Sequence, residues 1–522
     1  MLNAAFTRSA PQHGMSCSAR TLCDPYQEGL ALGRAGRHAE AIGRFEAALA
    51  RDPADIRALF ALGNTARALA MPEAAESFFR RVLALEPGRL EALVNLANLL
   101  RANGNPKAAI ALLEPALARA PSAAELWLAL GSAHRETDDR AEAERHWQEA
   151  LALTPEDPAA LGNLADLKAD AGDVDGALTL YDRALKRDGA NAQARLNRAI
   201  LHFLKGNLKD AWRDYAARLK LPGKVPQADH RLPAWDGAPL KKTRLLVSAE
   251  QGVGDQLMFA SLIPDLAARA AAAGGAVILE CEPRLQPLFA RSFAGVKVMA
   301  GDLQTKGGAV TAHYGWLKGL GGANRAVEMG TLPRFLRRSL ADFPAPNAYL
   351  VPDAEEVSRW RAWLAANGEG RAFGICWRSG KRGGLRNLQY AALEDWGRFL
   401  ARVPGRIVCA QYDAAADEIA ELERLSGRSL LLPPGLDQKA ELDRTGALLS
   451  SLDALITAPT AVSWLAAGAG VPTFKVLYDS SWTALGCDHE PFAPSCRLMR
   501  PDTPGDWVSA FDKTLAALTG RP

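Results

Sequence analysis

Carboxylates and glycines gather at one turn of this chain. The stretch SAEQGVGDQLMFASLIPDL, residues 248–266, follows an apolar run and leads into a helical pattern. Gly252 and Gly254 allow the backbone to approach a ligand closely, and the start of the next helix offers free N–H groups to an anion or a sugar hydroxyl. Glu250, Gln251 and Asp255 add polar side chains there. Asp255 has two possible roles, because aspartate in this position is also an ordinary helix cap.

A second loop combines cations with glycines. GICWRSGKRGGLRNLQY, residues 374–390, begins as an apolar strand that ends at Trp377. The residues that follow include Arg378, Ser379, Gly380, Lys381, Arg382, Gly383, Gly384 and Arg386. Backbone N–H groups and guanidinium forks in this arrangement suit a phosphate or diphosphate. The alternative is a solvated basic loop, which the interleaved glycines disfavour.

A third loop lies in ITAPTAVSWLAAGAGVP, residues 456–472. A strand runs into Pro459 and Thr460, and a helix of small residues follows. Thr460 is placed to cap that helix, and its hydroxyl could also bind a phosphate oxygen. The sequence leaves these two roles equally open.

These loops need a scaffold, and the pattern around them predicts parallel sheets. Short apolar runs alternate with helical stretches at residues 244–248, 276–281, 296–299, 373–377, 407–411, 454–457 and 473–477. Strands separated by helices imply parallel pairing. Prolines between residues 343 and 353 divide the region into two lobes, 244–350 and 351–522. In such α/β sheets ligands bind at the carboxyl ends of strands, where all three loops lie.

The first part of the chain is periodic at 34 residues. Proline recurs at Pro53, Pro87, Pro121 and Pro155, and alanine and large apolar residues recur in further registers. Small residues let helices approach, the large residue fills the gap between repeats, and proline ends the second helix. The pattern resembles the tetratricopeptide repeat (TPR) over residues 21–220. Six such units would form an all-α solenoid whose groove binds a protein segment.

Asn95, Asn163 and Asn197 share one register of the repeats. In the O-linked GlcNAc transferase family a similar asparagine ladder lines the groove and grips the backbone of an extended polypeptide. The resemblance implies that these asparagines bind a protein, and plain helix-surface asparagines are the alternative. Residues 1–20 are expected to be a disordered N-terminus. Four prolines within residues 221–243 predict a linker or a crossing segment.

Composition narrows the function classes. The 522 residues carry a net charge of only +3, which argues against nucleic acid or an anionic membrane as the main partner. The sequence contains no CxxC pair and no run of about 20 apolar residues, so we expect neither a metal site nor a membrane span. The N-terminal residues lack the apolar core of a signal peptide. We therefore expect a cytoplasmic protein with reduced thiols.

Because of these three loops, residues 245–500 resemble the bacterial TPR-linked glycosyltransferases related to heptosyltransferases. That family has the GT-B fold, two Rossmann-like lobes with the active site between them. Gly254-Asp255 matches its first loop, and the segment from Trp377 to Gly380 matches its phosphate loop. An Asp-Thr-x-x-x-His-Leu pattern near the end retains Thr460 and Leu465 here. Pro459 and Trp464 replace its aspartate and histidine, which puts the usual donor in doubt.

The loops around Asp255 and Arg378 are also similar to those of flagellin-modifying TPR–glycosyltransferases of bacteria with polar flagella. This resemblance implies transfer of a nonulosonic acid, such as pseudaminic acid, from its CMP-activated form to a Ser or Thr hydroxyl of flagellin. It implies Asp255 as the base, with Glu250, Gln251, Gly252 and Gly254 on the acceptor side. Donor phosphate would be held without a metal ion by Arg378, Ser379, Gly380, Lys381, Arg382, Arg386 and Thr460.

Two other functions stay open on the sequence. One is a TPR adaptor or scaffold with a degenerate, non-catalytic GT-B domain, which Pro459 and Trp464 favour. The other is a transferase acting on small glycans or lipopolysaccharide. The long solenoid favours a protein acceptor over this last possibility.

Overall fold

The computed structural model describes residues 24–223, 225–250, 252–306, 309–344, 348–380 and 383–520. The predicted N-terminal segment 1–20 and the predicted site residues Gln251, Lys381 and Arg382 lie outside these ranges. The chain divides into two compact units between Arg187 and Asp188. We call them the helical unit and the sheet unit.

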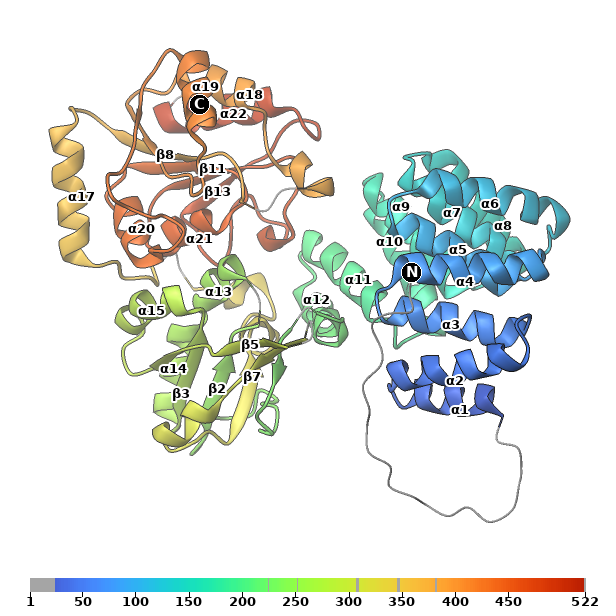
Figure 1. Ribbon diagram of the computed structural model, residues 1–522. Helices are drawn as coiled ribbons and strands as arrows, with labels where there is room; N and C mark the ends of the chain where they lie inside the picture. The colour runs from blue at the N-terminus through green and yellow to red at the C-terminus, as the bar shows by residue number, and fades with distance from the viewer. Residues whose placement is uncertain are drawn as a thin grey trace. The chain divides into compact units, whose positions relative to one another are not determined.

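The helical unit consists of five antiparallel helix pairs (Figure 1). They are α1 (Pro25–Arg34) with α2 (His38–Arg51), α3 (Ile56–Ala68) with α4 (Pro72–Leu85), α5 (Leu90–Ala102) with α6 (Pro106–Arg119), α7 (Ala124–Glu136) with α8 (Arg140–Leu153), and α9 (Pro158–Asp170) with α10 (Val174–Arg187). Asp55 and Asp157 begin α3 and α9 as N-caps.

The repeat registers explain why these helices pack. The recurring alanines, Ala41, Ala75, Ala109, Ala143 and Ala177, are fully buried. A Cβ on Gly29 or Gly63 would lie 2.5 or 2.6 Å from the ring of Phe45 or Phe79. The ring of the second helix therefore occupies the space that a side chain on the first helix would need. The predicted solenoid is confirmed in this unit.

A sixth helix pair belongs to the sheet unit. It comprises α11 (Ala192–Leu204), α12 (Leu208–Tyr215) and the 3-10 helix η1 (Ala216–Lys220). Trp212 is buried, and its Nε1 donates a hydrogen bond to the carbonyl oxygen of Arg337 over 2.9 Å. The boundary between the two compact units, after Arg187, thus lies one hairpin before the predicted domain boundary at residue 220. The reason is that α12 packs its aromatic face against the sheet-containing region.

The first lobe of the sheet unit has a parallel sheet in the order β4-β3-β2-β7. These strands are β2 (Arg244–Ser248), β3 (Ala276–Cys281), β4 (Lys297–Ala300) and β7 (Arg325–Glu328). Helices α13 (Val253–Ala260), α14 (Ile263–Ala272), α15 (Gln286–Ser292) and α16 (Pro333–Leu336) accompany them. A smaller sheet pairs β1 (Gln227–Ala228), β6 (Ala309–Ala312) and β5 (Leu303–Lys306) in the order β1-β6-β5.

The proline-rich segment 221–243 packs on this lobe. It supplies β1 and the buried Trp235, whose backbone N–H donates to the carbonyl of Ala326 over 2.7 Å. The ring of Trp235 packs on Phe335 at a centroid distance of 5.0 Å. The segment therefore crosses the lobe as part of its structure. A free linker would not bury such a residue.

The second lobe has a six-stranded parallel sheet in the order β10-β9-β8-β11-β12-β13. The strands are β8 (Ala372–Cys376), β9 (Arg406–Cys409), β10 (Leu430–Leu431), β11 (Ala454–Thr457), β12 (Thr473–Val476) and β13 (Cys496–Met499). Its helices are α17 (Ala354–Ala366), α18 (Leu393–Leu400), α19 (Ala416–Ser426), α20 (Leu442–Leu449), α21 (Ala461–Gly468) and α22 (Trp507–Thr519). The predicted α/β architecture with parallel sheets is confirmed.

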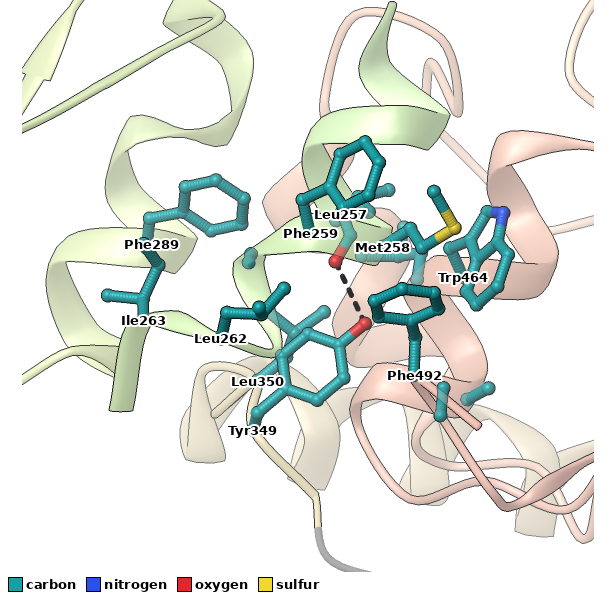
Figure 2. Packing of buried hydrophobic residues seen from close by; sticks show 14 of the residues in the cluster. Leu257, Met258, Phe259, Leu262, Ile263, Phe289, Tyr349, Leu350, Trp464 and Phe492 are labelled. Atoms are coloured by element: carbon teal, nitrogen blue, oxygen red, sulfur yellow. Dashed lines mark hydrogen bonds between the residues drawn. The ribbon is translucent and has the colours of Figure 1, made fainter. Parts of the chain in front are cut away.

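A continuous apolar core joins the two lobes. Figure 2 shows Leu257, Met258 and Phe259 of α13 among Trp464 of α21 and Phe492. The hydroxyl of Tyr349 donates to the carbonyl oxygen of Leu257 over 2.8 Å (Figure 2). Among the described residues, no helix has the length and apolar character needed to cross a lipid bilayer.

Candidate functional site

A cavity of about 850 Å³ lies between the two lobes of the sheet unit. Its walls come from loops at the carboxyl ends of β2, β3, β8, β9, β11 and β12. This volume is within the range of small-molecule sites, and the placement is usual for ligands of parallel sheets. All three loops singled out in the sequence contribute to it, through Glu250, Gly252, Gly254, Asp255, Ser379, Gly380 and Thr460.

Asp255 lies in the first turn of α13 and lines the cavity. Gly252 is the N-cap of α13. Burial, with a smaller contribution from the charge of Glu250, raises the pKa of Asp255 to about 6, and the backbone N–H groups of Gly252 and Asp255 oppose this shift. The carboxylate therefore has the pKa of a base that works near neutral pH.

Glu250 is held by an ion pair from the last hairpin. Its carboxylate accepts from Nε and Nη2 of Arg218 over 3.1 and 2.5 Å, and from the backbone N–H of Gly330 over 2.7 Å. Burial raises the pKa of Glu250, and the Arg218 guanidinium opposes the shift. Glu250 lines the cavity, but its oxygens are engaged by these donors. It fixes the loop that carries Asp255.

Gly252 and Gly254 serve different purposes. Gly252 is exposed, and the carboxylate of Asp255 lies 3.7 Å from where its Cβ would be. A Cβ on Gly254 would lie 3.5 Å from the Cα of Ala461 and 3.7 Å from the ring of Trp464. These are ordinary contact distances, so α13 packs against α21 of the other lobe without requiring glycine at position 254.

Arg378 departs from its expected role. Its Nε donates to Glu418 Oε1 over 2.6 Å, its Nη2 pairs with Glu418 Oε2, and Nη2 also donates to the carbonyl of Asp413 over 2.8 Å. The side chain is largely buried and is absent from the described lining of the cavity. Its charge is thus neutralised inside the second lobe. We therefore remove Arg378 from the donor-phosphate set.

Ser379 and Gly380 do line the cavity. The Ser379 hydroxyl lies 3.2 Å from the Tyr412 hydroxyl, which also accepts from the Gly380 N–H over 3.1 Å. A Cβ on Gly380 would lie 2.7 Å from Asp413 Oδ2, so a larger residue here would displace the Asp413 side chain. The backbone of Arg386 lies in the 3-10 helix η6 (Gly384–Gln389).

Thr460 is the N-cap residue of α21, but its side chain makes no capping hydrogen bond. Its Oγ1 lies 3.6 Å from Cys376 Sγ and 3.4 Å from Thr457 Oγ1. Burial raises the pKa of Cys376 to about 11, so this sulfur is a neutral thiol at physiological pH. Thr460 is therefore part of a small buried polar cluster at the cavity wall.

Two buried charged groups of the cavity were missed in the sequence. Glu280, at the end of β3, is 1% exposed, and its Oε2 accepts from Ala249 N–H and from the Tyr314 hydroxyl. Lys475 of β12 is 3% exposed, and its Nζ donates to Glu490 over 2.6 Å. Both interrupt apolar strand runs, a signal of function that sequence reasoning could have used.

Lys475 also contacts Trp464, which replaces the histidine of the Asp-Thr-x-x-x-His-Leu pattern. Its Nζ lies 4.1 Å from the centroid of the Trp464 ring, a cation–π geometry. The other described cations of the cavity lining, Arg284 and Lys439, each pair with an acid, Glu282 and Asp413 respectively. The described lining thus offers a ligand mainly backbone N–H groups and hydroxyls.

The asparagine register is split between the two units. Asn95 on α5 and Asn163 on α9 lie in the helical unit, whereas Asn197 on α11 lies in the sheet unit. Asn95 Nδ2 donates to Asn64 Oδ1 of the preceding hairpin over 3.0 Å. Asn197 Oδ1 accepts from Gln193 over 2.7 Å.

Comparison with known proteins supports the repeat assignment. Residues 26–89, 94–158, 128–176 and 163–229 match the tetratricopeptide repeat family. Protein FlbA of Caulobacter vibrioides is 32% identical over 378 residues. That alignment covers 71% of this chain and 63% of FlbA, so this chain spans less than two thirds of its relative. The repeat match ends at residue 229. An alignment of 378 residues is longer than this part of the chain, so it extends beyond the repeats.

Two solved structures match a smaller share of this chain. A thermophilic TPR protein of Thermus thermophilus is 28% identical, with a TM-score of 0.30 over 34% of this chain and 96% of its own. PilW, a type IV pilus biogenesis factor, is 24% identical, with a TM-score of 0.33 over 39% of this chain and 93% of its own. Nothing about the sheet unit follows from these matches.

Proposed function

We propose that this TPR protein is a protein O-glycosyltransferase that uses a nucleotide-activated sugar. The observation that carries the proposal is Asp255, a carboxylate with a pKa of about 6 in a cavity between two parallel sheets. A general base needs a carboxyl pKa near neutral pH inside a ligand cavity, whereas few structural roles of an aspartate need this. The resemblance to GT-B transferases gives the reaction class.

In the proposed reaction the acceptor hydroxyl oxygen attacks the anomeric carbon of the donor sugar. A new C–O bond forms, the bond from that carbon to the phosphate oxygen breaks, and the nucleotide leaves with the electron pair. The hydroxyl proton passes to Asp255. Glu250 takes no part in the proton transfer, because its carboxylate stays paired with Arg218. It holds the loop so that Asp255 faces the cavity.

On the donor side we propose Ser379, Gly380, Lys381, Arg382, Arg386 and Thr460. Ser379, Gly380 and Thr460 line the cavity, and their N–H and hydroxyl groups suit phosphate oxygens. A CMP-activated nonulosonic acid is the donor that the sequence resemblance favours. Such a donor releases a nucleoside monophosphate, which needs less charge neutralisation than a diphosphate.

On the acceptor side the TPR region would present the protein substrate. TPR solenoids bind protein segments, and the repeats of this chain support a protein-interaction role. Flagellin is our candidate acceptor, because the loop motifs around Asp255 and Arg378 resemble those of flagellin-modifying enzymes. We place the reaction in the cytoplasm, where nucleotide sugars are available.

Mass spectrometry of flagellin tests this function. Flagellin from cells that carry the wild-type protein should show a sugar mass increment on Ser or Thr that is absent from deletion cells. An Asp255→Asn strain should resemble the deletion, while an Arg213→Ala strain, changed at an exposed surface pair, should resemble the wild type. Identical flagellin masses in all four strains would exclude flagellin as the acceptor.

A second candidate is a TPR adaptor whose sheet unit no longer catalyses transfer. Its specific support is the contact between Trp464 and Lys475, since Trp464 stands where the resembling family has histidine. The capture of Arg378 by Glu418 points the same way. Calorimetry with CMP-activated sugar separates the candidates, because an adaptor would show no saturable binding in the cavity, whereas the enzyme would.

A further inference from the structure

Three potential metal ligands meet in the fourth helix pair. His134 lies on α7, and Glu142 and His146 lie one turn apart on α8. Each offers one ligating atom, and these atoms all lie within 4.8 Å of one another. Glu142 follows His134 by eight positions and precedes His146 by four. The hairpin between α7 and α8 brings the three side chains together.

The buried histidine points to a ligand. His146 is 4% exposed, and its Nδ1 has no hydrogen-bond partner among the described residues. This nitrogen lies 3.8 Å from Glu142 Oε2, too far for a hydrogen bond but suitable for two ligands of one ion. A buried polar atom without a partner is destabilising, and such atoms need an explanation. Coordination of a cation would satisfy it.

Aromatic rings enclose the buried His146 side chain on two sides. The rings of His134 and His146 meet at a centroid distance of 5.0 Å and an interplanar angle of 80°. Trp127 packs against the His146 ring from the other side at 5.4 Å.

Other charged groups near the cluster compete with a metal ion or add to its ligands. Glu142 pairs with Arg145, but the Glu142 side chain is 41% exposed and that of Arg145 is 50% exposed. Exposed pairs of this kind contribute little to stability, so a metal ion can displace Arg145 from Glu142. Asp139 Oδ2 lies 3.6 Å from His134 Nδ1 and adds a second nearby carboxylate.

We propose that His134, Glu142 and His146 bind one divalent transition-metal ion and that Zn²⁺ is the ion that suits them best. Two imidazoles and one carboxylate form a zinc ligand set, with a fourth position for water. The ion would cross-link α7 to α8 and stabilise the fourth TPR hairpin. This site is separate from the proposed glycosyltransfer site. It would overturn the sequence-based expectation of no metal.

Calorimetric titration of the untagged, chelator-treated full chain with Zn²⁺ tests the proposal. We expect one ion per chain in the wild type and a rise of the melting temperature with Zn²⁺ concentration. Replacement of Zn²⁺ by Co²⁺ should give the visible absorption of a four-coordinate ion. The absence of saturable binding to the wild type would overturn the site.

Variants identify the ligands. His134→Ala should abolish binding, and Glu142→Gln, which keeps the side-chain volume, should weaken it at least about tenfold, an effect of the size seen at metal sites. His146→Ala removes a buried ring, so circular dichroism must first show that it folds. His489→Ala changes a histidine beside Asp488, outside the cluster, and should bind as the wild type does. Unchanged affinity in both His134→Ala and Glu142→Gln would overturn the assignment.

Discussion

The guanidinium of Arg218 and the carboxylate of Glu250 form a buried bidentate ion pair, with side chains 5% and 2% exposed. Arg218 ends the last helical hairpin, and Glu250 precedes the glycine turn that carries Asp255. Nη2 of Arg218 also donates to the Thr331 hydroxyl over 2.9 Å. The last hairpin is thus tied directly to the loop that positions the proposed base.

Removal of one partner of this pair should be strongly destabilising. Arg218→Ala leaves the Glu250 charge buried, and a broken buried pair costs about 3–5 kcal/mol. Arg213→Ala, at an exposed pair with Asp210, should change the free energy of unfolding by less than about 1 kcal/mol. Urea unfolding followed by circular dichroism measures both. Equal stability of the two variants would show that the pair contributes little.

Truncation should show where the sheet unit begins. A chain that starts at residue 188 keeps α11, α12 and η1, and should unfold cooperatively. A chain that starts at residue 221 loses the buried Trp212, Tyr215 and Arg218 and should aggregate or unfold at lower urea. Size-exclusion chromatography and urea titration compare the two. If both fold equally well, the sixth hairpin is dispensable for the sheet unit.

Much of the fold could be predicted because it is periodic along the chain. The 34-residue registers predicted the helix pairs, and apolar runs predicted β2, β3, β4, β8, β9, β11 and β12. Six short strands were missed, since short runs carry little signal. They are β1, β5, β6, β7, β10 and β13. The prolines of residues 221–243 left a linker and a crossing segment open, and the burial of Trp235 decides for the crossing segment.

The site was harder to predict because its interactions join distant residues. The loops of Asp255, Ser379 and Thr460 could be found, since strand ends and glycines mark them. Nothing local to Arg378 shows that Glu418, 40 positions later, captures its guanidinium. The same holds for Glu250 and Arg218, which are 32 positions apart. Charged residues in a loop are therefore poor guides to ligand contacts until their internal partners are known.

Gly330→Ala should disturb the buried ion pair without removing a charge. A Cβ there would lie 2.5 Å from Glu250 Oε1 and 3.1 Å from Arg218 Nη2, so the pair must shift. Overpacking of this kind typically costs about 1–3 kcal/mol. Gly254→Ala is the matched control, because its Cβ would meet Ala461 at an ordinary contact distance of 3.5 Å. Thermal unfolding should rank Gly330→Ala below Gly254→Ala, and the reverse order would contradict the packing argument.

Asp255→Asn should stabilise the protein at high pH. The pKa of Asp255 is about 6 in the folded chain, above its value of about 3.9 in an unfolded chain. The folded state therefore binds the proton more tightly, and the wild type loses stability as pH rises from about 4 to about 6. Asparagine has no such charge and keeps an oxygen for the helix start. The difference should be small at pH 4 and reach about 1–3 kcal/mol at pH 8. A constant difference across this range would refute the raised pKa.

The same substitution tests Asp255 as the base through the pH dependence of turnover. Only the carboxylate form accepts a proton, so wild-type turnover should fall below pH 6 and level off above it. Asp255→Asn should lower turnover by about 10²–10⁴ and remove the inflection near pH 6, while donor affinity measured by calorimetry stays unchanged.

A helix-start role alone predicts a different result, because asparagine caps about as well as aspartate. In that case Asp255→Asn would keep wild-type turnover, and only Asp255→Ala would lose stability, by about 0.5–2 kcal/mol. Wild-type turnover in the asparagine variant, with the inflection retained, would remove Asp255 from the reaction and favour the adaptor function.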